Sequence, residues 1–266
     1  MHRGFITRSR GVPMGSVMTA ERRMRLWSLV VDNAHGQPVT VEHVGAVAIS
    51  ASDVDSAAVS VTVSATPRET IYASDRVASD LEELTLTLGE GPCLDAFTGG
   101  PALVADLTAP DCLARWPMFA PAAAQAGARA VFALPLQVGA IRVGVLGLYR
   151  AQPGGLDREQ LADALVLADT ACALLLDAAH LDGARPDGSW PEQAAPQHPE
   201  VHQATGMIIV QLGVTAAVAL IRLRAYAYAQ DRRLRDVAAD VVARRLRFHP
   251  DTDIATHTDG QDRGGG

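Results

Sequence analysis

The stretch "RAVFALPLQVGAIRVGVLGLYR", residues 129–150, decides the fold class of the larger part of the chain. Two apolar runs flank Val138-Gly139-Ala140, and a central glycine is typical of the turn of a hairpin. The stretch therefore predicts a β-hairpin, in which two antiparallel strands lie side by side.

Strands and helices also alternate on both sides of this hairpin. Apolar runs predict further strands over residues 44–50, 57–63, 69–74 and 101–107. Helical periodicity predicts helices over residues 19–33, 75–87 and 156–180, with Asp157 as the N-cap of the last, and a loop with a helix over 109–127. This order predicts an α+β domain over residues 19–181, with an antiparallel sheet flanked by helices.

The segments outside this domain differ in composition. Residues 1–18 are basic without an apolar core, which predicts a flexible leader and no signal peptide. Residues 182–198 are rich in proline, glycine and polar residues and predict a linker; residues 249–266 predict a disordered tail. The chain has no apolar run long enough to span a membrane, and its three widely spaced cysteines suggest a reducing cytoplasm.

Only helical periodicity remains over residues 199–248. Pro199 and Gly213 bound a first helix, Thr215 caps a second that reaches Gln230, and a third runs from Leu234 to Leu246. The second helix is apolar on two sides. One side holds Val218, Ile221, Ala225 and Tyr228, and the other Leu220, Leu223 and Ala227. We expect Ala225 and Tyr228 to face inward, and a second subunit, rather than the α+β domain or another helix, to cover the other side.

Charge separates this helical segment from the rest of the chain. The formal net charge is −7, but residues 198–250 hold eight arginines and four acids, a net of +4. All 23 basic residues are arginine, which excludes the sites that need lysine, such as a lysine-bearing phosphate loop. The segment is thus suited to a polyanion, and arginine beside tyrosine suits RNA. The predicted RNA-binding residues are Arg222, Tyr226, Arg232, Arg233, Arg235 and Arg244.

Residues 202–248 resemble the ANTAR domain, a three-helix RNA-binding module of bacterial antiterminators. The resemblance rests on Gly206-Met207, Leu212-Gly213-Val214, Leu223-Arg224 and "LRDVAADVV" at 234–242. Thr205 stands where many relatives carry lysine. The resemblance implies a homodimer that binds RNA hairpins in nascent transcripts and prevents a terminator from forming.

The larger domain resembles a GAF domain, chiefly in residues 84–107 and 129–150. This implies a sensory α/β module that often dimerises and sometimes binds a small effector, here unknown; no cofactor is predicted. The pairing of the two domains resembles actinobacterial transcription regulators, which are not enzymes. The alternatives are a DNA-binding helix-turn-helix regulator and a GAF-type thiol redox enzyme or sensor.

Three residues of the larger domain are candidates for a redox site or a ligand pocket. Cys93 follows Pro92 in the first turn of a short helix, where the helix dipole lowers the pKa of a thiol. Cys112 is a candidate to face it, and Trp116 to line a pocket, although all three residue types are also common in cores. His198 and His202 have a metal-ligand spacing but no third ligand nearby in the sequence, so no metal site is predicted.

Overall fold

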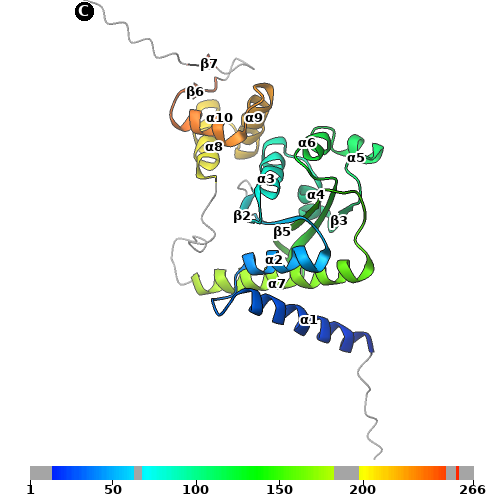
Figure 1. The fold of residues 1–266 in the computed structure, drawn as a ribbon. Helices are drawn as coiled ribbons and strands as arrows, with labels where there is room; N and C mark the ends of the chain where they lie inside the picture. Colours follow the sequence, from blue (N-terminus) through cyan, green and yellow to red (C-terminus); the bar gives the residue numbers. More distant parts are fainter. Residues whose placement is uncertain (1–13, 63–67, 183–197, 250–255, 258–266) are drawn as a thin grey trace, which may run out of the picture.

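The computed structural model describes residues 14–62, 68–182, 198–249 and 256–257. It contains a five-stranded antiparallel sheet with helices on both faces, followed by a module of three helices (Figure 1). The predicted α+β fold class is confirmed. Residues 14–182 are called the sheet domain below, and residues 199–248 the helical module.

The predicted hairpin forms the centre of the sheet. The strands are β1 (Ser56–Val61), β2 (Glu69–Ala73), β3 (Ala102–Val104), β4 (Ala130–Val138) and β5 (Ile141–Arg150), in the order β2-β1-β5-β4-β3. Val138 pairs with Ile141 across the turn, where Gly139 has a φ of 59°. A Cβ on Gly144 would lie 2.2 Å from the Ser60 carbonyl oxygen, so glycine allows β1 and β5 to approach closely.

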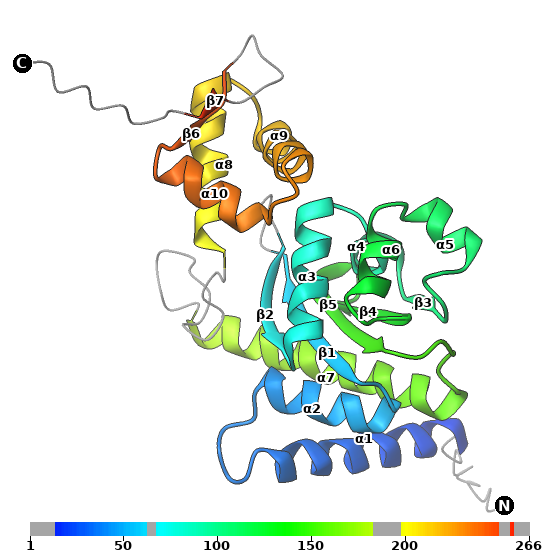
Figure 2. The same cartoon turned by 45° about the horizontal axis from the view of Figure 1, so that its top comes forward.

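Side chains of β4 and β5 alternate between two apolar cores, one on each face of the sheet. Leu146 and Leu148 face α1 (Met14–Asn33), α2 (Val41–Ser52) and α7 (Arg158–Asp182). Val145 and Tyr149 face the other layer, formed by α3 (Arg76–Leu88), α4 (Pro92–Gly99), α5 (Pro110–Arg115) and α6 (Phe119–Gln125) (Figure 2). Each fully buried leucine contributes about 1.5–3 kcal/mol to this packing.

The predicted strand over residues 44–50 is wrong, because this run lies inside helix α2. Val44, Val47 and Ala48 are buried at the i, i+3, i+4 spacing of a helix face. The Thr40 backbone N–H donates to His43 Nδ1 at 3.0 Å and helps to start the helix. A short apolar run bounded by polar residues fits a buried strand and a buried helix equally well, and here packing between α1, α7 and the sheet favours the helix.

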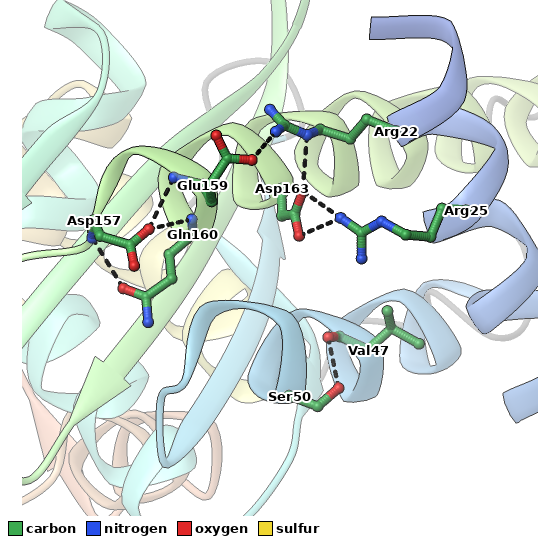
Figure 3. A network of polar contacts seen from close by, with 8 residues as sticks. All are labelled: Arg22, Arg25, Val47, Ser50, Asp157, Glu159, Gln160 and Asp163. Atoms are coloured by element: carbon green, nitrogen blue, oxygen red, sulfur yellow. Dashed lines mark hydrogen bonds and ion pairs between the residues drawn. The ribbon is translucent and has the colours of Figure 1, made fainter. Parts of the chain in front are cut away.

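Polar contacts fasten α1 across α7 (Figure 3). Arg22 Nε lies 3.0 Å from Asp163 Oδ1, and Arg25 Nη2 donates to both Asp163 oxygens at 2.7 and 2.8 Å. Asp157 caps α7 as predicted, since its Oδ1 accepts the backbone N–H groups of residues 159 and 160 at 2.8 Å. Helix α1 begins at Met14 rather than Thr19, so the predicted leader ends earlier than expected.

The helical module consists of α8 (Pro199–Leu212), α9 (Ala216–Ala229) and α10 (Leu234–Val242), close to the three predicted helices. Gly213 ends α8 with a φ of 66°, and the Thr215 hydroxyl accepts the Val218 N–H at 3.4 Å to start α9. Strand β6 (Leu246–Arg247) pairs with β7 (Thr256–His257), so part of the predicted disordered tail forms a two-stranded ladder. Most of the predicted linker, residues 183–197, lies outside the described residues.

Candidate nucleic-acid interface

The three helices of the helical module enclose one apolar cluster. Its buried members on the helices are Val201, Ala204 and Ile208 of α8, Ala219, Leu223 and Ala227 of α9, and Leu234, Val237, Ala238 and Val241 of α10, and Leu246 and Phe248 join it after α10. Leu86 of α3 belongs to the same cluster and is only 6% exposed. The sheet domain therefore supplies part of the apolar core of the helical module.

Helix α9 buries the opposite side from the one expected. Tyr228 is 55% exposed, and Ala225 is exposed as well, so the prediction that they face inward is wrong. Val218 and Ile221 lie on the same exposed stripe, at 39% and 61%. The helix has two apolar sides. The spacing of apolar residues in the sequence does not reveal which side packs on α8, α10 and Leu86. The outward apolar stripe, with Val218 and Ile221, is exposed to solvent in the single chain.

The six residues predicted to bind RNA do not form one continuous surface. Arg222 lies on the exposed side of α9, whereas the Tyr226 ring packs edge-on against Phe248 with centroids 5.8 Å apart. Arg244 follows α10 in a left-handed conformation, with a φ of 59°. It lines a groove of about 790 Å³ on the outer side of α8, together with the highly exposed Val210.

Three of the six lie together at the turn between α9 and α10. Arg232 Nη2 contacts Asp240 Oδ2 at 2.8 Å, and Arg235 forms an ion pair with the next residue at 3.8 Å. Arg233 instead reaches out of the module to Asp80 of α3, with its Nη2 3.6 Å from Asp80 Oδ1. The turn thus places two positive charges close to the sheet domain, half-exposed at 45% for Arg233 and 43% for Arg235.

A cleft of about 390 Å³ separates α3 and α6 from α9. Its apolar part includes Leu84, Leu88 and Met118, and its rim carries Arg232 and Arg233. The Tyr228 hydroxyl lies 3.6 Å from the Met118 sulfur and spans the cleft. Figure 2 shows α3 beside α9 and α10 at this boundary, which is called the α3 seam below.

Two hydrogen bonds close the α3 seam beside Leu86. Arg224 Nε donates to the Leu86 carbonyl oxygen at 2.8 Å, and its guanidinium covers Gly89, where a Cβ would meet Nη1 at 2.9 Å. The Leu234 N–H donates to Thr87 Oγ1 at 3.3 Å. Burial lowers the pKa of Arg224, but the guanidinium stays charged. The sequence assigned no partner to Arg224, because the receiving carbonyl is distant along the chain.

Two histidines at the start of α8 contact carboxylates of the sheet domain. His198 Nε2 lies 3.6 Å from Glu83 Oε2, and His202 Nε2 contacts Glu69 Oε1. Within the described residues, no group of three histidine, cysteine or acidic side chains could hold a metal ion. The two histidines therefore join the start of α8 to α3 and to β2.

The interior of the sheet domain holds a buried polar network at Cys93, whose side chain is 1% exposed. The Tyr149 hydroxyl donates to Glu82 Oε1 at 2.6 Å and lies 3.6 Å from Cys93 Sγ, while Glu82 pairs with Arg68. Burial raises the pKa of the Cys93 thiol and outweighs the opposite effect of Arg68. The shift is opposite to the one expected from the helix start.

The other two candidates in this domain lie at the same apolar cluster. Trp116 is 4% exposed, and its Nε1–H donates to Asp95 Oδ2 at 3.2 Å, as in a satisfied core residue. Cys112 is half-buried at the edge of the cluster that contains Cys93, and both thiols are free. Burial also raises the pKa of Cys112, so neither thiol is activated by its surroundings.

No single helix among the described residues is long and apolar enough to cross a membrane. Helices α8 and α9 pass that length and composition test only as a pair, bent by 106° at Gly213 to Thr215.

Comparison with solved structures returns matches for the sheet domain. The GAF domain of a phosphoenolpyruvate-protein phosphotransferase from Coxiella burnetii is 15% identical, with a TM-score of 0.47, over 62% of this chain and 98% of that chain. A domain of a two-component sensor histidine kinase protein from Sinorhizobium meliloti is 16% identical, with a TM-score of 0.45, over 54% and 93%. The free methionine-R-sulfoxide reductase from Neisseria meningitidis is 16% identical, with a TM-score of 0.38, over 63% and 96%. Scores at this level do not assign the sheet domain to a family.

The helical module gives a more specific result. No curated protein matched the chain. The family model of the ANTAR domain matches residues 192–242, which span α8, α9 and α10 and amount to about a fifth of the chain. The match and the three helices together show that residues 192–242 of this chain are an ANTAR domain.

Proposed function

We propose that this chain is a transcription regulator that binds hairpins in nascent RNA, in the cytoplasm, and prevents termination. The observation that carries the proposal is the ANTAR domain at residues 192–242. Its arginines supply a net charge of +4 over residues 198–250 in a chain of net charge −7, so the attraction for a polyanion is local to the helical module.

The exposed arginines of α9 and of the α9–α10 turn are the proposed contacts to RNA. Guanidinium groups bind phosphate through paired N–H donors and also stack on unpaired bases. Arg222 is exposed on α9, and Arg233 is 45% exposed at the turn. Neither side chain belongs to the apolar cluster of the helical module, so both can be truncated with little effect on folding.

The test is a double substitution, R222A/R233A, with a matched control. R23A/R115A removes the same charge from exposed positions on the sheet domain, where Arg23 and Arg115 are 62% and 63% exposed. The probe is a labelled RNA with two adjacent stem-loops, selected from a random-loop library on the full chain. We expect R222A/R233A to weaken binding about tenfold or more and to reduce the salt slope by about one per arginine. If R222A/R233A and the control variant bound the RNA with equal affinity, the assignment of Arg222 and Arg233 to the RNA-binding surface would be wrong.

The same assay separates the second candidate function, DNA binding by a helix-turn-helix. A recognition helix presents a wet face to the major groove, whereas α9 exposes an apolar stripe with Val218 and Ile221. We expect duplex DNA to compete weakly with the stem-loop RNA. Tight binding to duplex DNA without binding to RNA would favour this alternative.

The outward stripe of α9 also supports a homodimer. The exposed apolar residues Val218 and Ile221 lie on one face of the helix, which a second copy can cover. ANTAR regulators are expected to act as dimers by the resemblance described above, and this face is the one we assign to that contact.

Control of RNA binding is proposed to come from a signal at the sheet domain, which resembles a GAF domain in its sequence. A thiol redox role is the weaker proposal, since Cys93 is 1% exposed and burial raises its pKa. A C93S variant that retains the redox response of RNA binding would exclude Cys93 as the sensor. If C93S abolished the redox response, Cys93 would be supported as the sensor.

A further inference from the structure

The α3 seam contains one apolar anchor and a set of opposed charges. Leu86 is the anchor, because its side chain packs in the apolar core of the ANTAR domain and not in the two apolar cores of the sheet domain. Around it, the carboxylate of Asp80 on α3 faces Arg233, and that of Glu83 lies 3.6 Å from His198 Nε2. A polar pocket of about 100 Å³ lies between them, lined by Asp80, Glu83, His198, Arg233 and Arg235.

The cations at this seam overlap with the residues proposed to bind RNA. Arg233 and Arg235 line the polar pocket, and Arg232 and Arg233 line the adjacent cleft. In the docked chain, Arg233 Nη2 lies 3.6 Å from Asp80 Oδ1, so a carboxylate already faces part of the guanidinium proposed to contact RNA. An acidic helix face and a phosphate backbone both present anionic oxygens to a guanidinium, so they compete for the N–H donors of Arg233.

The polar groups of the α3 seam are incompletely hydrogen-bonded, which favours the replacement of Asp80 by another anion at Arg233. Glu83 Oε1 is buried without a hydrogen-bond partner among the described residues, and His198 Nδ1 has only a 3.6 Å contact with Glu200 Oε1 there. Asp80 and Arg233 are 3.6 Å apart and remain 34% and 45% exposed, a geometry that contributes little free energy. A buried polar group left without a partner costs about 1–3 kcal/mol, so the seam is held mainly by its apolar anchor.

We infer that the acidic face of α3, centred on Asp80 and Glu83, is an internal competitor of RNA for the arginines of the α9–α10 turn. The inference rests on the proposed RNA-binding function. Docking on α3 holds the helical module in a state of low RNA affinity, and RNA binding requires that Arg233 leave Asp80. The partner that this surface fits is therefore the chain's own ANTAR domain.

The test neutralises the competitor and leaves the RNA-binding residues intact. D80N/E83Q removes two charges from the seam, and D32N/D177N removes two from exposed positions on α1 and α7, beneath the opposite face of the sheet. Affinity for the selected stem-loop RNA is measured on the full chain. We expect D80N/E83Q to bind about threefold to tenfold more tightly than the natural chain, and D32N/D177N to match the natural chain within twofold.

A second measurement follows docking directly. The Leu234 N–H, which donates to Thr87 across the seam, should exchange with solvent faster when RNA is bound. Unchanged or weaker RNA binding by D80N/E83Q, or unchanged exchange at Leu234 on RNA binding, overturns the inference while the proposed function stands. If the natural chain and both variants fail to bind any stem-loop RNA, the proposed function fails, and the inference fails with it.

Discussion

Truncation of Leu86 should undock the helical module without unfolding the sheet domain. Leu86 belongs to α3, yet it is 6% exposed within the apolar cluster of α8, α9 and α10. Buried leucine-to-alanine changes cost about 2–5 kcal/mol, and the low end applies where neighbours can relax into the space. The partly open cleft lined by the next two residues, Thr87 and Leu88, gives the neighbours room to relax, so L86A should weaken docking by about 2 kcal/mol, or about 30-fold.

Amide hydrogen exchange at Leu234 measures this loss. Its N–H donates to Thr87 Oγ1, and this bond crosses from one domain to the other. We expect Leu234 to exchange about 30-fold faster in L86A than in the natural chain, since opening of the seam exposes it.

L81A is the matched control, one turn and a half away on the same helix. Leu81 is fully buried in the sheet domain, in the cluster of Phe119 and Tyr149. Its truncation should speed exchange in α3 and the sheet while the Leu234 amide keeps its protection. Equal exchange of Leu234 in L86A and the natural chain would refute the reasoning, as would an equal effect of L81A and L86A.

Three further substitutions test other contacts. Y149F removes the hydroxyl that donates to Glu82 Oε1 at 2.6 Å, and should lower the free energy of unfolding by about 1.5–3 kcal/mol in a urea titration; a change under 0.5 kcal/mol would contradict the network. D75A removes the carboxylate that accepts the Ala78 N–H at 2.8 Å and caps α3, and should cost about 1 kcal/mol in thermal unfolding, with D75N largely neutral. I221E places a charge on the exposed stripe of α9 and should convert the proposed dimer to a monomer in sedimentation without lowering the melting temperature; a dimer that persists in I221E would exclude this stripe as the subunit contact.

The elements that the sequence predicted correctly carry local signals. Pro199 and Gly213 bound α8 where expected, because proline suits the first turn and glycine accepts the left-handed conformation at the end. The hairpin at residues 129–150 was predictable for the same reason, since Gly139 takes the positive φ of the turn. Such signals depend on a few neighbouring residues and survive in any tertiary context.

The features that the sequence did not predict depend on distant partners. Tyr149 and Glu82 meet across 67 positions of the chain, and the acceptor of Arg224 is a backbone carbonyl at Leu86. Because every residue has a backbone carbonyl, the sequence does not indicate which of them accepts a hydrogen bond from a distant side chain. Residues 44–50 were assigned to a strand because an uninterrupted apolar run has no period that would reveal the helix.

Helix α9 connects the two contacts that a regulator of this kind needs. Its buried side, with Leu223 and Ala227, meets Leu86 at the α3 seam, and its exposed side, with Val218 and Ile221, is free for a second copy. The two sides lie nearly opposite each other at 100° per residue, so docking and dimerisation can coexist on one helix. Dimerisation by itself would then leave Arg233 facing Asp80. Under the proposed function, a signal that switches RNA binding would then act on the α3 seam, and α3 joins that seam to the buried network of Glu82 and Tyr149 within its own length.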